Sequence, residues 1–67
     1  MHDIILDFIR RYLDEWGYGP SHRDIQFGCG ISSTSMVAKY LDELEASEDI
    51  TRTPGVARSI RIKGEQT

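Results

Sequence analysis

The sequence is poor in the residues that build covalent or metal-bound scaffolds. Its 67 residues include one cysteine, Cys29, and two histidines, His2 and His22. A lone cysteine excludes an internal disulfide, and these three side chains are too few and too scattered for a zinc site. We therefore expect no metal and no cofactor. A single unpaired thiol is also typical of a reducing compartment, which predicts a cytoplasmic location.

Long apolar runs and a basic N-terminus are missing too. No stretch approaches the roughly 18 apolar residues of a membrane span, and Met1-His2-Asp3 lacks the positive start of a signal peptide. We expect no membrane partner. The length allows one small domain, whose core lies near the lower limit for folding without disulfides or metals. A composition of 39% hydrophobic and 28% charged residues predicts a folded chain rather than a disordered one.

The residues that could support catalysis are few. His22, Asp24 and Cys29 could pair a thiol nucleophile with a base, but Cys29 falls in a short apolar turn and so small a chain offers little room for a pocket. We expect a structural thiol, no small-molecule substrate and no enzyme.

Basic residues are outnumbered, but unevenly along the chain. The net charge is −3, which by itself argues against a nucleic-acid partner. Residues 1–49 hold ten acidic and four basic side chains, whereas residues 50–67 hold four basic and one acidic. The C-terminal part is thus a basic arm on an acidic body, an asymmetry that favours electrostatic binding.

Apolar residues recur every three or four positions from residue 3 to 16, which predicts an amphipathic helix ending at Gly17. Its expected buried stripe contains Ile5, Phe8, Ile9, Tyr12, Leu13 and Trp16.

A second, short helix is expected after the turn formed by Gly17-Tyr18-Gly19-Pro20. Ser21 is a natural N-cap, and Asp24 three residues later can complete a capping box. This helix should bury Ile25 and either Phe27 or Cys29, and should end by Gly30. Gly28 is expected to weaken its last turn by about 1 kcal/mol.

The third helix is predicted from about Ser32, as its cap, to Ala46 or Ser47. Val37, Leu41 and Leu44 share one face, while the opposite face is small or singly basic. Two short helices joined by a few residues that include glycine are typical of a helix-turn-helix. We expect the carboxylates near its end to be solvated; they are Asp42, Glu43, Glu45, Glu48 and Asp49.

Residues 50–53 and 57–63 are β-branched and alternate in polarity around Pro54-Gly55, which predicts a hairpin. Ile60 and Ile62 should face the helices. The expected fold is α+β, mostly α: a three-helix winged helix-turn-helix over residues 1–64 with a C-terminal two-stranded β-hairpin wing. Residues 65–67 are expected to be a flexible tail.

In this order and spacing, the motifs give the chain a family resemblance over about residues 4–62. It resembles the N-terminal DNA-binding domain of LexA repressors in Phe8-Ile9-Arg10, Gly17-Tyr18-Gly19-Pro20-Ser21, Asp24-Ile25, Gly30-Ile31-Ser32-Ser33, the ladder Val37, Leu41 and Leu44, and Arg58-Ser59-Ile60-Arg61.

The chain also departs from that family. Gln26 and Cys29 stand where the family usually has alanine and leucine, and Ser35, Ala38 and Lys39 stand where LexA has base-reading Asn and Glu groups. The family's operator therefore does not transfer. No counterpart of its self-cleaving domain is visible in the sequence.

The candidate DNA-binding residues fall into three groups. On the third helix, side chains that could reach base edges or phosphates could equally be a solvated face. In the hairpin, arginines that could bind phosphate could equally protect a sheet edge. Arg23 could hold a phosphate, with the Tyr18 hydroxyl beside it, although Tyr18 could simply cover the core. The candidates are Arg23, Ser33, Thr34, Ser35, Ala38, Lys39, Arg52, Arg58 and Arg61, with Arg58 favoured in the wing and Lys63 as an outward-facing neighbour.

We therefore expect a sequence-specific module for double-stranded DNA, a LexA-like transcriptional regulator (repressor) that lacks the self-cleaving domain. So small a module needs a homodimer or a fused partner domain for useful affinity. The alternative is a protein-protein interaction module that docks on another regulator or polymerase subunit, which the acidic total favours.

Overall fold

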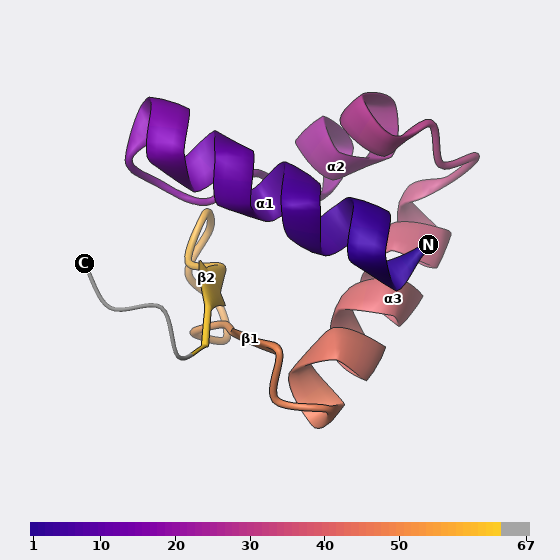
Figure 1. Ribbon diagram of the computed structural model, residues 1–67. Helices are drawn as coiled ribbons and strands as arrows, with labels where there is room; N and C mark the ends of the chain where they lie inside the picture. Colours follow the sequence, from indigo (N-terminus) through magenta and orange to yellow (C-terminus); the bar gives the residue numbers. More distant parts are fainter. Residues whose placement is uncertain (64–67) are drawn as a thin grey trace.

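The computed structural model describes residues 1–63, which form three helices followed by a two-stranded sheet (Figure 1). The helices are α1 (His2–Trp16), α2 (His22–Cys29) and α3 (Thr34–Ala46), and the strands are β1 (Ile50–Thr51) and β2 (Arg61–Ile62). The predicted class, mostly α with a C-terminal wing, is confirmed. The predicted tail, residues 65–67, lies outside the described residues. Within residues 1–63, no helix combines the length and the apolar character that crossing a membrane requires.

Helix α1 ends where the sequence predicted. Gly17 adopts the left-handed conformation, with φ of 80°, and its N–H donates to the Leu13 carbonyl. Ile5 and Ile9 are fully buried, as expected for the apolar stripe. Trp16 was wrongly placed in that stripe, since its side chain is 54% exposed and packs on the rings of Tyr12 and Tyr18. The stripe reaches solvent here because Trp16 is the last helical residue.

Helix α2 begins with the predicted capping box. Ser21 Oγ accepts from the Asp24 N–H at 3.1 Å, and the Asp24 carboxylate accepts from the Ser21 N–H at 3.0 Å. The helix ends at Gly30, whose φ is 69°. Of the two alternatives for the inner face, Cys29 is half-buried against the core, whereas Phe27 is 73% exposed.

Helix α3 begins one residue later than predicted. Ser33, not Ser32, is the N-cap, and its Oγ accepts from the Met36 N–H at 3.3 Å. Either serine has a hydroxyl that could cap a helix. The helix start that agrees with the burial of Val37, Leu41 and Leu44 is the one capped by Ser33. Ser32 is exposed.

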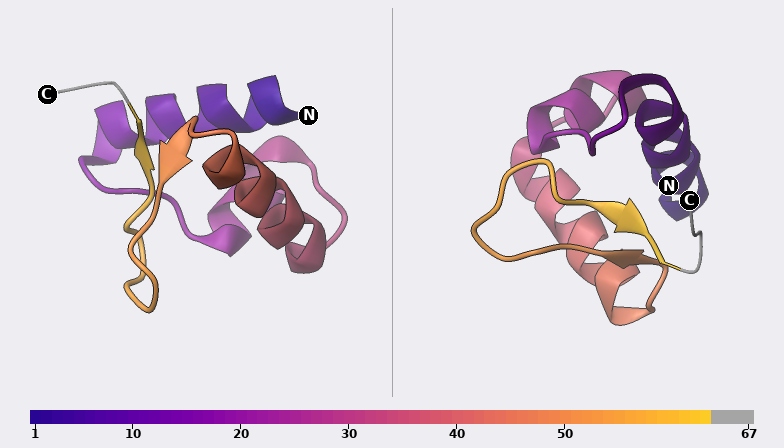
Figure 2. Two further views of the ribbon diagram at one scale, coloured as in Figure 1. Left: turned by 90° about the horizontal axis from the view of Figure 1, so that it is seen from below. Right: turned by 90° about the vertical axis from the view of Figure 1, so that its left-hand side faces the viewer.

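The strands are shorter than predicted. They pair antiparallel with Ile50 opposite Ile62 and Thr51 opposite Arg61, and residues 52–60 form a long loop, here called the wing loop (Figure 2). Beyond these pairs, Ser59 Oγ accepts from the Thr53 N–H, and Arg58 takes a positive φ of 57° with its carbonyl accepting from the Gly19 N–H rather than from the opposite strand. The prediction that Ile60 and Ile62 face the helices is confirmed, because both are buried.

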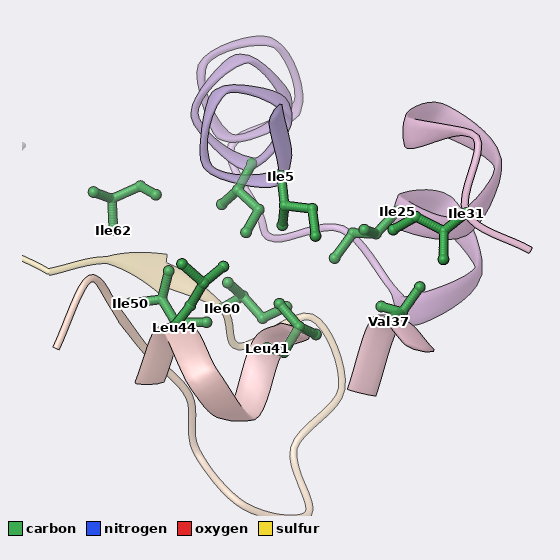
Figure 3. Close-up of a cluster of buried hydrophobic side chains, with 10 residues drawn as sticks. Ile5, Ile25, Ile31, Val37, Leu41, Leu44, Ile50, Ile60 and Ile62 are labelled. Carbon is green, nitrogen blue, oxygen red and sulfur yellow. The ribbon is translucent and has the colours of Figure 1, made fainter. Parts of the chain in front are cut away.

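The core lies where all five elements meet. Its ten members are apolar, and most are β-branched isoleucines; Figure 3 shows them converging between α1, α2, α3 and the strands. The buried residues are Ile5, Ile9, Ile25, Ile31, Val37, Leu41, Leu44, Ile50, Ile60 and Ile62. In the wing loop, Ile60 is part of this core, and the other residues of the loop are exposed or half-buried. Polar contacts must therefore help to place the loop.

Candidate nucleic-acid interface

The wing loop extends toward the side of the molecule where α2 and α3 begin. Both views in Figure 2 show this arrangement, with α1 on the opposite side of the molecule. The loop is closed by a turn in which the Val56 N–H donates to the Thr53 carbonyl at 3.1 Å, with Gly55 at φ 77°. Ser59 Oγ also bridges the loop, since it accepts from the Thr53 N–H at 2.9 Å. The start of α2 and the closed wing loop therefore lie next to each other on one side of the fold.

The predicted recognition surface of α3 is open at its first turns. Thr34, Ser35 and Lys39 are exposed, while Ala38 is half-buried and presents a methyl group. Ser33 Oγ serves as the cap, but its hydroxyl proton remains available to donate. Within residues 1–63, Lys39 forms no ion pair with a carboxylate, so its charge is available to a partner.

Arg23 lies in the first turn of α2, between the two residues of the capping box, and is exposed. It also forms no ion pair with any described carboxylate. The Tyr18 ring packs on Tyr12 and Trp16 and lies beneath the Arg58 guanidinium, while Tyr18 stays 42% exposed. Arg23 therefore presents an exposed positive charge on this side of the fold.

Arg52 joins the base of the wing loop to α3. Its Nε and Nη2 donate to Glu45 Oε1 at 3.1 and 2.7 Å, and Nη2 donates to Asp42 Oδ1 at 2.6 Å. Burial acts to lower the pKa of Arg52, but the bonds to Asp42 and Glu45 outweigh it, and the pKa is raised overall. The side chain is 21% exposed. The side chains of Asp42 and Glu45 are 73% and 41% exposed, which agrees with the expected solvated face, and in addition both bind Arg52.

Arg58 joins the other limb of the wing loop to α1, α2 and the turn between them. Its Nη1 donates to Tyr12 Oη at 2.9 Å and to Asp24 Oδ2 at 3.1 Å, and lies 3.4 Å from the Gly19 carbonyl oxygen. Its guanidinium carbon is 5.1 Å from the centroid of the Tyr18 ring. The bond to Tyr12 is the main cause that raises the pKa of Arg58.

Asp24 has two structural roles at once. It completes the capping box and also accepts from Tyr12 Oη at 3.1 Å and from Arg58. The Ser21 N–H is the main cause that holds the pKa of Asp24 below its usual value, with smaller contributions from Ser21 Oγ, Tyr12 and Arg58. The carboxylate is therefore ionised at neutral pH.

Arg61 lies apart from the other candidates. It is exposed on the outer face of β2, and together with Arg10, Arg11 and Asp14 it lines a shallow groove between α1 and the strand. Lys63 follows it and pairs with Glu48, a bond that lowers the pKa of the Glu48 carboxyl. Of the three arginines in residues 50–63, Arg52 and Arg58 thus pair with carboxylates of the helices, whereas Arg61 lines the groove beside α1.

Sequence reasoning missed Tyr12 and Asp24 as partners of Arg58. Tyr12 was assigned to the buried stripe and Asp24 to the capping box alone, and they lie 46 and 34 positions away from Arg58. The periodicity around each residue gives no signal for contacts at such separations.

A short helix, a glycine-containing turn, a second helix with an open N-terminal surface and an adjoining hairpin loop together define a winged helix-turn-helix domain. The family model of the LexA DNA binding domain matches residues 3–59, and the chain belongs to this family.

Curated relatives agree with this assignment. The LexA repressor of Roseiflexus sp. (strain RS-1) is 51% identical over 59 residues, which are 88% of this chain and 27% of that protein. The LexA repressor of Moorella thermoacetica is 42% identical over 88% of this chain and 29% of its own length. The LexA repressor of Bacillus cytotoxicus is 44% identical over 92% of this chain and 30% of its own length. The chain therefore spans less than a third of the length of these relatives.

Proposed function

We propose that the chain binds double-stranded DNA sequence-specifically, as the DNA-binding part of a LexA-like transcriptional repressor. The observation that carries this proposal is that the open first turns of α3 and the wing loop lie on one side of the fold (Figure 2). An α-helix fits the major groove, and a neighbouring loop can follow the adjacent backbone. We propose a binding function without catalysis, in the cytoplasm.

Base edges would be read from α3. Thr34 and Ser35 hydroxyls can donate or accept, the Ala38 methyl can contact a thymine methyl, and Lys39 can donate to guanine O6 and N7. The Ser33 hydroxyl, whose oxygen accepts from the Met36 N–H, would donate its proton to a nearby phosphate. Because only Lys39 adds a charge to this surface, base readout depends on the fit of small side chains against the groove.

Phosphates would be held by Arg23 at the start of α2 and by Arg61 of the wing. Arg61 would reach the backbone only where the duplex extends along β2, since it lies toward α1. Arg52 and Arg58 are already engaged with carboxylates, so their contribution would come from holding the wing loop in place. The proposed set comprises Arg23, Ser33, Thr34, Ser35, Ala38, Lys39, Arg52, Arg58 and Arg61.

A single domain of this kind buries about 600 to 1,000 Å² of protein surface on DNA. Useful affinity then requires two half-sites occupied together, so we propose that the chain acts as a homodimer or through a partner domain.

The test is an NMR titration with a random-sequence duplex at low salt, followed by the salt dependence of the dissociation constant. We expect amide shifts confined to residues 33–39, the start of α2 and the wing loop. Affinity should fall steeply with salt, because binding releases counterions from the phosphates. Arg23→Gln should lower the slope of that dependence by about one, because Arg23 is proposed to hold a phosphate. Shifts centred on α1, or none at all, would contradict the proposal.

The second candidate is a module that docks on another regulator or a polymerase subunit. It is favoured by the net charge of −3 and by Phe27, which stands exposed on α2. Binding through such a surface would change little with salt, and Phe27→Ser would weaken it while leaving DNA binding intact.

A further inference from the structure

The wing loop has few bonds of its own to keep it in place. Its strands pair over two residues each, and within the loop the Thr53–Val56 turn and the Thr53–Ser59 bridge hold it closed. These bonds fix the loop's shape but not its position relative to α2 and α3. That position depends on contacts between the loop and the helices.

On the return limb, Ile60 is anchored in the core, and Arg58 supplies the polar side-chain contacts to the helices. One nitrogen, Nη1, faces Tyr12 Oη on α1, Asp24 Oδ2 on α2 and the Gly19 carbonyl in the turn between them. The guanidinium also lies against the Tyr18 ring. Tyr12 in turn donates to Asp24, so the three side chains form a closed triangle of hydrogen bonds.

The backbone of Arg58 is shaped for the same contact. Its φ of 57° is a conformation that residues other than Gly, Asn and Asp seldom adopt. Its carbonyl accepts from the Gly19 N–H at 3.3 Å. Both the main chain and the side chain of Arg58 are thus bonded to the segment that links α1 to α2. An unusual conformation retained in this way is maintained by the surrounding contacts.

We infer that Arg58 is a positioning residue, which holds the wing loop beside α2 and α3 for DNA binding rather than contacting phosphate as a free cation. The inference rests on the proposed function. If Arg58 left Asp24 for a phosphate, the ionised Asp24 carboxylate would face the duplex without its partner and repel it. Keeping the triangle intact avoids that repulsion.

Arginine and lysine separate the two roles. A phosphate contact needs mainly a positive charge, which lysine also provides. In the triangle, Nη1 reaches both Tyr12 and Asp24 while the guanidinium lies over the Tyr18 ring. A lysine side chain is one bond shorter and has no planar face, so it does not reproduce this arrangement. Arg58→Lys is therefore the informative variant, and Arg58→Gln removes the charge as well.

The first measurement uses no DNA. The ¹⁵N relaxation of residues 52–60 is compared in the wild type, Arg58→Lys, Arg58→Gln and Tyr12→Phe, with the thermal transition checking that the helices stay folded. We expect the wing loop to become more mobile in all three variants while α2 and α3 are unchanged. A wing loop that stays as ordered as in the wild type would overturn the positioning role.

The second measurement is the dissociation constant of duplex DNA and its salt slope. Arg58→Lys and Arg58→Gln should both bind about tenfold more weakly, with the slope unchanged. Arg23→Gln is the matched control for losing one arginine that contacts phosphate. The inference is overturned if Arg58→Lys binds like the wild type and Arg58→Gln lowers the slope by about one. If the wild type binds no duplex, the proposed function fails, and the relaxation data alone decide whether Arg58 holds the loop.

Discussion

Gly19 lies against the backbone of Ile60 so closely that no side chain fits between them. A Cβ atom at Gly19 would come within 2.7 Å of the Ile60 carbonyl oxygen and 3.0 Å of its amide nitrogen. These are backbone atoms of the wing's return limb, so they cannot move aside without shifting that limb. We predict that Gly19→Ala destabilises the fold by about 1–3 kcal/mol, the usual cost of overpacking, as measured by urea unfolding.

Gly17 is the control for this prediction. It lies in the same turn and has φ of 80°, yet no atom lies within 4 Å of the position its Cβ would occupy. Gly17→Ala should cost about 1 kcal/mol through its left-handed backbone alone. The amide resonances of the wing loop should move in Gly19→Ala and stay in place in Gly17→Ala. Equal shifts in the two variants would show that the close approach to Ile60 is not what matters.

Gly28 makes room for the ring of Phe8, and this contact gives a second prediction. A Cβ at Gly28 would come within 2.2 Å of Phe8 Cε1. In a Phe8→Ala background, Gly28→Ala should stabilise α2 by about 1 kcal/mol, because alanine is the better helix former. With Phe8 present, that gain should be lost or reversed, since the ring must leave α2. A double-mutant cycle by urea unfolding measures the difference, and additive effects would contradict the prediction.

The local features of the fold could be predicted from the sequence because they depend on neighbouring residues. The stops at Gly17 and Gly30 and the capping box of Ser21 and Asp24 each lie within one helical turn. The choice between Ser32 and Ser33 could not be made locally, since both carry a capping hydroxyl. The weakness expected at Gly28 stays a prediction from its helix propensity. The sequence does not show that the Phe8 ring occupies the space a Cβ at Gly28 would need.

The candidate site was harder to predict, because its arrangement depends on tertiary contacts. The open face of α3 followed from helical periodicity. The partners of Arg52 and Arg58 did not, since charge counts along the chain treat each arginine as free. The basic arm is therefore less available than the sequence indicates, and how Arg52 and Arg58 act on DNA remains a prediction.

Arg52 provides the third prediction. Because it bridges the wing to Asp42 and Glu45 of α3 from a largely covered position, Arg52→Met should destabilise the fold by about 0.5–1 kcal/mol. The matched control is Arg11→Met, which breaks an exposed pair with Asp7 within α1 and should cost about 0.3–0.5 kcal/mol or less. Urea unfolding compares the two. In DNA binding, Arg52→Met should leave the salt slope unchanged, and a slope lower by about one would show a direct phosphate contact instead.

Asp24 should give the fold an acid-sensitive component of stability. Its pKa is lower in the folded chain than the unfolded value of about 3.9, mainly because its carboxylate accepts from the Ser21 N–H. A group of this kind stabilises the fold at pH values above its unfolded pKa, and the contribution is lost as the pH falls through the folded pKa. Asp24→Asn should therefore be less stable than the wild type at pH 7, by about 1 kcal/mol from the weakened capping box. The difference should shrink below about pH 4 as the wild-type carboxyl becomes protonated.

Glu15→Gln removes an exposed carboxylate outside the cluster and serves as the charge-matched control. Thermal unfolding of the three proteins between pH 2 and pH 7 checks this, because that range covers most of the interval of about pH 1 to 5 in which such carboxyls titrate. A gap between Asp24→Asn and the wild type that stays constant with pH would show that the Asp24 charge contributes nothing to stability.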